Sequence, residues 1–337
     1  MENLLNALVV LANFVLIPGL AYGAQLALGA LGVTLNYAVL RFSNFAHGDL
    51  MAFGTMATIL GTWWLQSMGV SFGPLPTALL VLPLGILAAV LLALGTDRVV
   101  YRFYRQRRSA PVVFVIVSVG VMFIYNALVR FFIGVEDIRF EDGERFVIRA
   151  RDFQEMTGLD EGLALRSSQV LTVVVTLVAV VALFWFLQRT RTGKAMRAFS
   201  DNEDLALLSG IDPKRVVLIT WALAATLATL AGVLYGLDKS FRPFNYFQLL
   251  LPIFAAAIVG GIGKPFGAVI GGFVVAFSEV GLTYAYRRVL GHVVPEDWMP
   301  SGLAQLLSTD YKFAISFIIL VLVLLLRPTG ILRGRVI

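Results

Sequence analysis

Long apolar stretches separated by short polar segments dominate the sequence of this chain. A helix needs about 20 apolar residues to cross a hydrocarbon core of about 30 Å. The apolar runs that approach this length are 20–40, 50–65, 76–94, 111–132, 170–187, 216–237, 247–262, 266–284 and 313–326. The sequence lacks the short alternating segments of a transmembrane β-barrel. We therefore predict an all-α polytopic membrane protein with about 8–9 transmembrane helices, in a single domain that covers residues 1–337.

The first apolar stretch, residues 4–40, is longer than one span needs and is interrupted by Pro18-Gly19. Two spans within it would leave almost no connecting loop. We therefore expect an interfacial or partly inserted helix over 2–17, followed by one span. The basic start of a secretory signal peptide is missing, since Glu2 is the only early charge.

The charges of the loops orient the chain, because an excess of Lys and Arg in short loops marks the cytoplasmic side. Residues 97–108 carry five Arg against one Asp, and 189–215 carry six Lys or Arg. By contrast, 136–166 carries nine Asp or Glu and five Arg, which suits an extracytoplasmic loop over 134–168. We expect the N-terminus outside and the C-terminus in the cytoplasm. The segments then expected near the inner face are 44–49 and 263–265.

Composition excludes several classes of function. The chain is 58% hydrophobic and 14% charged, whereas about a quarter of the residues in a soluble domain are charged. The absence of Cys excludes thiolate metal sites and disulfides, and His47 and His292 lack metal-ligand spacing, so we expect no metal and no cofactor. The net charge of +6 falls mostly on the predicted cytoplasmic side, which indicates orientation and lipid contact rather than nucleic-acid binding.

The sequence also lacks the parts of an enzyme or a motor. Gly263-Lys264 resembles the end of a phosphate-binding loop, but Ile258 occupies the first glycine position and Pro265 replaces the Ser or Thr. No nucleophile elbow is present, so we expect no catalytic residue. Ionisable groups within the runs are too few for a typical proton- or sodium-driven carrier. A transporter of this sequence would therefore need an external energy source.

A charged island over 190–215, between two apolar runs, is the most informative feature for function. Its apolar residues recur at helical spacing. Ser200 or Asp201 can cap a second helix, Gly210 can end it in a left-handed conformation, and Asp212-Pro213 stops it before the next span. The pattern predicts a short helix–turn–helix at the membrane surface. It either docks onto a cytoplasmic partner or lies on the headgroups as an amphipathic connector.

Polar residues within the apolar runs are costly unless they face protein or water. The candidates for a pathway or a gate are Gln25, Asn36, Asn44, His47, Asn126 and Glu279. Interhelical hydrogen bonds are the alternative for most of them. Asn44 or Asp49 can instead cap the following helix, and Glu279 either pairs across a helix interface or contacts a substrate ammonium group.

Residues 260–272 contain six Gly around Lys264-Pro265. Such a segment permits a re-entrant path that lines a cavity. A tight turn between two closely packed helices is the alternative, and the sequence favours it. The glycines of this candidate hinge are Gly260, Gly261, Gly263, Gly267 and Gly271.

Three segments, in order, resemble the permeases of branched-chain amino-acid ABC importers. They are GLAYGAQLALGALGVTLNYAVLRFSNFAHGDLMAFG (19–54), with its N-F-A-H-G motif, GKAMRAFSDNEDLALLSGIDPKRV (193–216), and AAAIVGGIGKPFGAVIGG (255–272). The resemblance covers most of the chain and identifies the island as the segment that couples to an ATPase. The residues that the island and the resemblance mark for coupling are Gly193, Ala195, Arg197, Asp201, Glu203, Ala206, Gly210 and Ile211.

The resemblance implies a permease of the branched-chain amino-acid and ribose type in a bacterial inner membrane. Its implied partners are two ABC ATPase subunits, a second homologous permease subunit and an extracytoplasmic binding protein. The implied substrates are branched-chain or other hydrophobic amino acids, and urea or short-chain amides are the alternative. An ATP-independent secondary carrier remains the alternative from another class.

Overall fold

The computed structural model describes residues 2–295, 302–327 and 329–332. It begins with one continuous helix of 39 residues, formed by α1 (Glu2–Leu11), η1 (Ala12–Leu16) and α2 (Ile17–Leu40). The break expected at Pro18-Gly19 is absent, so the separate helix expected over 2–17 is wrong. Pro18 lies in the first turn of α2 directly after the wider π-helical turn η1. That turn accommodates the proline ring and its missing N–H without ending the helix.

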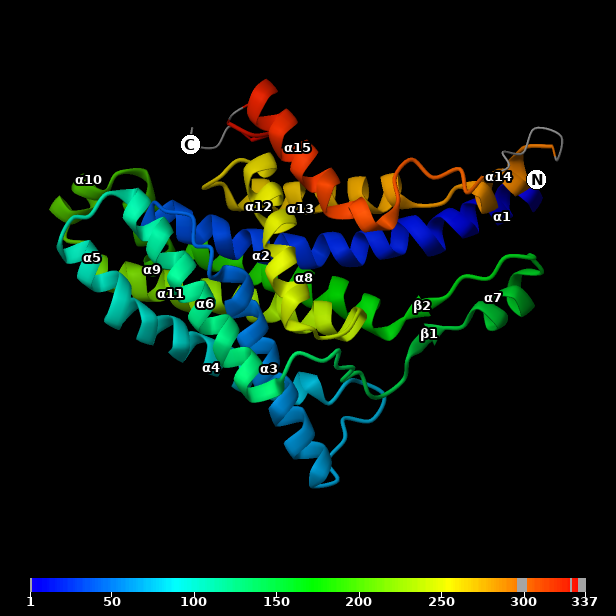
Figure 1. The fold of residues 1–337 in the computed structure, drawn as a ribbon, viewed down its shortest axis with the longest axis horizontal. Helices are drawn as coiled ribbons and strands as arrows, with labels where there is room; N and C mark the ends of the chain where they lie inside the picture. The colour runs from blue at the N-terminus through cyan, green and yellow to red at the C-terminus, as the bar shows by residue number, and fades with distance from the viewer. Residues whose placement is uncertain (1, 296–301, 328, 333–337) are drawn as a thin grey trace.

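The rest of the described chain is also almost entirely helical (Figure 1). The helices that follow are α3 (His47–Ser67), α4 (Ala78–Thr96), η2 (Asp97–Tyr101), α5 (Arg102–Gln106), α6 (Pro111–Ile133), α7 (Ala150–Thr157), α8 (Ser167–Arg189), α9 (Arg191–Asp201), α10 (Glu203–Leu208), α11 (Pro213–Asp238), α12 (Pro243–Gly260), α13 (Pro265–Thr283), α14 (Arg287–Val293), η4 (Thr309–Tyr311) and α15 (Lys312–Leu326). The two short strands, β1 (Phe146–Ile148) and β2 (Leu165–Arg166), pair antiparallel in the segment that was expected to be an outer loop. Four of the helices begin with a proline, at the position where its missing N–H costs no hydrogen bond.

Seven helices of the described residues are long and apolar enough to cross a membrane. They are Glu2–Leu40, Ala78–Gln106, Pro111–Ile133, Ser167–Arg189, Pro213–Asp238, Pro243–Gly260 and Pro265–Thr283. At two further expected positions, α3 is more polar and α15 has 15 residues. The expected all-α polytopic membrane fold is confirmed, and the predicted count of about 8–9 is an approximation to these helices.

The first helix forms the centre of the bundle. Residues 21–36 of α2 are buried on every face, where α8, α11, α12 and α13 pack around it. Gly272 on α13 allows the closest approach, because a Cβ there would lie 2.6 Å from the backbone nitrogen of Ala27. The polar side chains of this helix are therefore held inside protein rather than in lipid.

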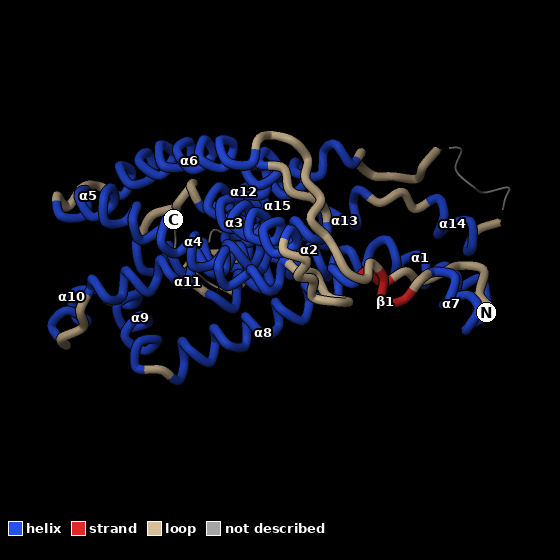
Figure 2. Tube along the Cα trace, turned by 90° about the horizontal axis from the view of Figure 1, so that it is seen from below, coloured by secondary structure: helices blue, strands red, loops and turns tan. Residues whose placement is uncertain are grey.

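The two ends of the molecule differ in what they carry. In Figures 1 and 2, α5, α9 and α10 lie together at one end of the long axis, whereas α1, α7 and α14 lie at the other. The basic segment 97–108 and the charged island therefore share one end. The acidic segment expected outside belongs to the opposite half.

Candidate functional site

The charged island forms two short helices held against the bundle. The hydroxyl of Thr190 accepts a hydrogen bond of 3.0 Å from the Gly193 amide and so caps α9. Gly193 must be glycine, because a Cβ there would lie 2.6 Å from the Cα of Leu187 on α8. Met196 and Phe199 are buried against the bundle. The helix α9 is thus fixed closely to the end of α8.

The boundaries of α10 differ in one residue from the prediction. Asp201 is the last residue of α9, and Asn202 caps α10 by accepting a hydrogen bond of 3.0 Å from the Leu205 amide. The expected cap at Ser200 or Asp201 is therefore wrong, since α9 continues through both residues. Gly210 has the expected left-handed conformation, with φ of +80°. The side chain of Asp212 accepts from the Lys214 amide at 2.9 Å and so caps α11.

The tip of the island presents apolar side chains to the surroundings. Leu205, Leu207 and Leu208 are 61%, 41% and 85% exposed, whereas Ala206 between them is buried. Of the other predicted coupling residues, Arg197, Asp201 and Glu203 are exposed, and Ala195 and Ile211 are half-buried. The predicted residues therefore surround a projecting apolar tip, although sequence reasoning did not single out its leucines as exposed.

The N-F-A-H-G motif lies deeper than the end of the helix that precedes it. His47 packs against α2, where a Cβ on Gly32 would lie 2.6 Å from its Cε1 atom. Gly32 is eight residues before the end of α2, or about 12 Å along the helix. The segment expected near the inner face, 44–49, thus lies within the bundle rather than level with the end of α2. Residues 42–46 turn back into the bundle and start α3 inside it.

Hydrogen bonds hold this re-entrant turn to α6. The Phe45 amide donates to the Ser118 hydroxyl at 3.1 Å, and Asn126 Nδ2 donates to Asp49 Oδ1 at 2.7 Å. Asn44 Oδ1 accepts from the Ala46 amide at 3.1 Å, but the N-cap of α3 is Ala46 and no side chain caps this helix end. The prediction that Asn44 or Asp49 caps the following helix is therefore wrong. Two of the candidate pathway residues, Asn44 and Asn126, thus have structural partners.

A second buried cluster was missed by sequence reasoning. Asp97 on η2 accepts from Nη1 and Nη2 of Arg105, at 2.9 to 3.0 Å, and from the indole of Trp221 at 2.8 Å. It joins the basic segment to α11. The signal available in the sequence was an Asp at the end of an apolar run, which by itself does not identify a partner 124 residues away.

The remaining pathway candidates are buried around α2. Gln25 Nε2 donates to the Leu234 carbonyl at 3.4 Å, and the side-chain amide of Asn36 has no hydrogen-bond partner among the described residues. Glu279 on α13 accepts a hydrogen bond from Ser316 on α15, which favours the predicted pairing across a helix interface. The structure brings Glu279 and Gln25 to helices that pack on one another, but it does not join all six candidates in one site.

The glycine-rich segment forms a tight turn. Gly261 and Gly263 have φ of +106° and +81°, conformations that favour glycine. A Cβ on Gly260 would overlap the Gly267 carbonyl, and one on Gly271 would overlap the Ala256 carbonyl. The helices α12 and α13 therefore touch backbone to backbone, as in the closely packed turn that the sequence favoured over a re-entrant path.

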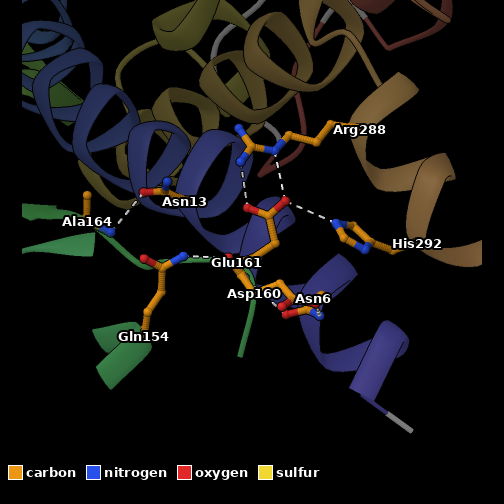
Figure 3. A network of polar contacts seen from close by, with 8 residues as sticks. All are labelled: Asn6, Asn13, Gln154, Asp160, Glu161, Ala164, Arg288 and His292. Atoms are coloured by element: carbon orange, nitrogen blue, oxygen red, sulfur yellow. Dashed lines mark hydrogen bonds and ion pairs between the residues drawn. The ribbon is translucent and has the colours of Figure 1, made fainter. Parts of the chain in front are cut away.

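A polar cluster at the opposite end joins three distant segments (Figure 3). Glu161 accepts from Arg288 Nε and Nη2 at 2.9 and 2.7 Å, and its Oε1 lies 3.0 Å from His292 Nε2. Asn6 accepts from the Glu161 amide at 3.2 Å, and Asn13 accepts from Ala164 at 3.2 Å. Burial raises the pKa of Glu161, but the hydrogen bonds from Arg288 and His292 outweigh it and bring the pKa below its ordinary value. Within the described ranges, no group of three His, Cys, Asp or Glu side chains is placed to hold a metal.

The described residues form a bundle of apolar, membrane-length helices with a projecting, capped helical pair at its basic end, as expected of a multi-pass membrane protein. Comparison with known proteins identifies the family. The chain belongs to the family described as branched-chain amino acid transport system, permease component, whose model matches residues 15–324. Members of this family are permease subunits and not enzymes.

Individual relatives match either nearly the whole chain or a part of it. The high-affinity branched-chain amino acid transport system permease protein LivH of Escherichia coli (strain K12) is 30% identical over 325 residues, or 94% of each chain. The corresponding protein BraD of Pseudomonas aeruginosa is 29% identical over 95% of each chain. The ribose import permease protein RbsC of Escherichia coli (strain K12) is 31% identical over 108 residues, which is 30% of this chain and 34% of its own. No solved structure matches this chain.

Proposed function

We propose that this chain is the transmembrane subunit of an ATP-driven ABC importer that translocates branched-chain or other hydrophobic amino acids. Family membership supports the substrate class. The observation that best supports an ATPase partner is the exposed apolar tip formed by Leu205, Leu207 and Leu208. Exposed apolar side chains grouped at a polar end of a protein mark a surface that another protein covers.

The proposed orientation places α5, α9 and α10 in the cytoplasm of a bacterium, with the chain in its inner membrane. The basic residues of 97–108 and 189–215 support it, since they lie at one end of the molecule. The N-terminus is then outside, together with α7 and α14, and the C-terminus is cytoplasmic. The outer segment 134–168 and α14 would face an extracytoplasmic binding protein that delivers the substrate.

The proposed complex contains two ABC ATPases, this permease and a second homologous permease. ATP binding closes the two ATPases and moves the docked α9–α10 pair. The pair is well suited to transmit that movement, because Gly193 packs directly on α8 and Asp212 caps α11. Tilting of α8 and α11 opens the route outward, and hydrolysis resets it. Such coupling requires that the ATPases bind the two conformations with different affinity.

Gentle purification of the tagged chain from its native membrane, followed by mass spectrometry, tests the partners. We expect two ATPases and a second permease to accompany it. The same complex in vesicles, with its binding protein, is then tested for ATP-dependent uptake of leucine and of urea. Uptake of urea alone would favour the amide-type alternative. A chain that is isolated without partners, and that moves solute without ATP, would show a secondary carrier instead.

A further inference from the structure

Arg41 occupies a conformation that side chains with a Cβ rarely adopt. It ends α2, and its amide donates to the Tyr37 carbonyl at 3.0 Å. Its φ of 62° and ψ of 23° lie in the left-handed region, where glycine carries no steric penalty. A strained residue of this kind persists where its surroundings hold it in place.

The guanidinium of Arg41 binds the far end of α9. Its Nη2 atom donates to the backbone carbonyl of Ser200, the second-last residue of that helix and 159 positions away in sequence. Carbonyls at a helix C-terminus carry partial negative charge and lack partners within the helix. A cation that donates to one of them makes a charge-assisted hydrogen bond. Arg41 thereby ties the first helix to the predicted coupling segment.

The residues directly after Arg41 are anchored on other helices. The ring of Phe42 is buried between the rings of Tyr101 and Phe114, with centroid distances of 5.3 and 5.2 Å. Phe45 bonds to Ser118 on α6, and the turn then enters α3 beside His47. A displacement of Arg41 is therefore passed to the buried start of α3 through a short, well-packed segment.

We propose that Arg41 is a positioning residue of the transport cycle, which carries the movement of α9 to residues 42–46 and to the buried start of α3. This rests on the proposed function, because α9 moves only if an ATPase docks on the island. The backbone alone does not call for an arginine, since glycine would satisfy the left-handed turn without strain. The side-chain contact with Ser200 supplies the reason for it.

The test compares Arg41→Gly with the wild-type chain in the complete complex with its ATPases. Glycine keeps the turn and removes the guanidinium. Uptake of substrate and hydrolysis of ATP are measured together in vesicles. We expect the ATPases to stay bound and the number of substrate molecules moved per ATP to fall about tenfold, as for loss of one charge-assisted hydrogen bond. Arg102→Gln, which removes a charge from the exposed face of α5, should leave this ratio unchanged.

Two results would overturn the proposal. An Arg41→Gly complex that transports with the wild-type ratio would show that Arg41 only closes the turn. A variant that no longer retains its ATPases would show a structural rather than a positioning role. If the wild-type chain itself has no ATPase partner, the proposed function fails. That failure is seen in the wild-type complex and is therefore distinct from a failure of the Arg41 proposal, which is seen only in the variant.

Discussion

The indole of Trp221 donates a hydrogen bond of 2.8 Å to the buried carboxylate of Asp97, and so joins α11 to the helix that carries the basic segment. Removing the donor leaves a carboxylate oxygen with one partner fewer in a buried site. We predict that Trp221→Phe lowers the free energy of unfolding by about 1–3 kcal/mol. Thermal unfolding in detergent checks this. The control is Trp64→Phe at a side chain that is 62% exposed, and an equal effect of both variants would contradict the prediction.

The apolar tip of α10 should determine binding of the ATPase. We predict that Leu208→Asp reduces the amount of ATPase that co-purifies by about tenfold, because a charge replaces an apolar side chain in the proposed interface. Met156→Asp is the matched control, since Met156 is also 85% exposed but lies on α7 at the opposite end. Quantitative mass spectrometry of the purified complexes measures the ratio. Equal retention in the two variants would exclude the tip as the docking site.

The contact between α12 and α13 should not tolerate a single methyl group. We predict that Gly267→Ala destabilises the permease by about 1–3 kcal/mol or more, because its Cβ would overlap the Gly260 carbonyl and the backbones must separate. Gly120→Ala on α6 meets no atom within 4 Å and should stabilise the helix by about 0.5–1 kcal/mol. Melting temperatures in detergent distinguish the two. A neutral Gly267→Ala would show that the helices can move apart freely.

Acid should weaken the polar cluster around Glu161. The pKa of Glu161 is lowered in the folded state, so its contribution to stability is present above its unfolded pKa of about 4.3 and is lost as the pH falls through the folded value. We predict that Glu161→Gln reduces the loss of thermal stability on acidification below about pH 4.3. Glu155→Gln, which changes an exposed pair with Arg151, should lose thermal stability on acidification as the wild type does. Identical pH profiles for wild type and Glu161→Gln would refute the assignment.

Much of the fold follows from local sequence, because apolar run length and helix-end residues act over a few positions. The spans, the left-handed Gly210 and the start of α11 at Pro213 were predictable in this way. The continuous helix through Pro18 was not, since a π-helical turn absorbs the proline. The cap of α10 is Asn202 rather than the predicted Ser200 or Asp201, because α9 continues through both of those residues.

The features of the candidate site that the sequence did not predict arise from contacts between distant segments. Nothing near His47 in the sequence indicates that residues 42–46 turn back along α2. The contacts there come from residues far away in the sequence, since Gly32 on α2 packs against His47 and Asn126 on α6 bonds to Asp49. The partner of Arg41 is likewise set by where α9 ends. Residue types therefore indicated which side chains were costly to bury, whereas packing decided what each of them contacts.

The uninterrupted first helix has a geometric consequence for both ends of the molecule. At about 1.5 Å per residue its 39 residues extend for about 58 Å. Asn6 near one end belongs to the polar cluster around Glu161, and Arg41 directly follows the other end. If this rod pivots about its middle by about 5°, each end is displaced by about 2.5 Å in opposite directions. A movement at one end of the molecule can thus displace the other end without any change in the internal structure of this helix.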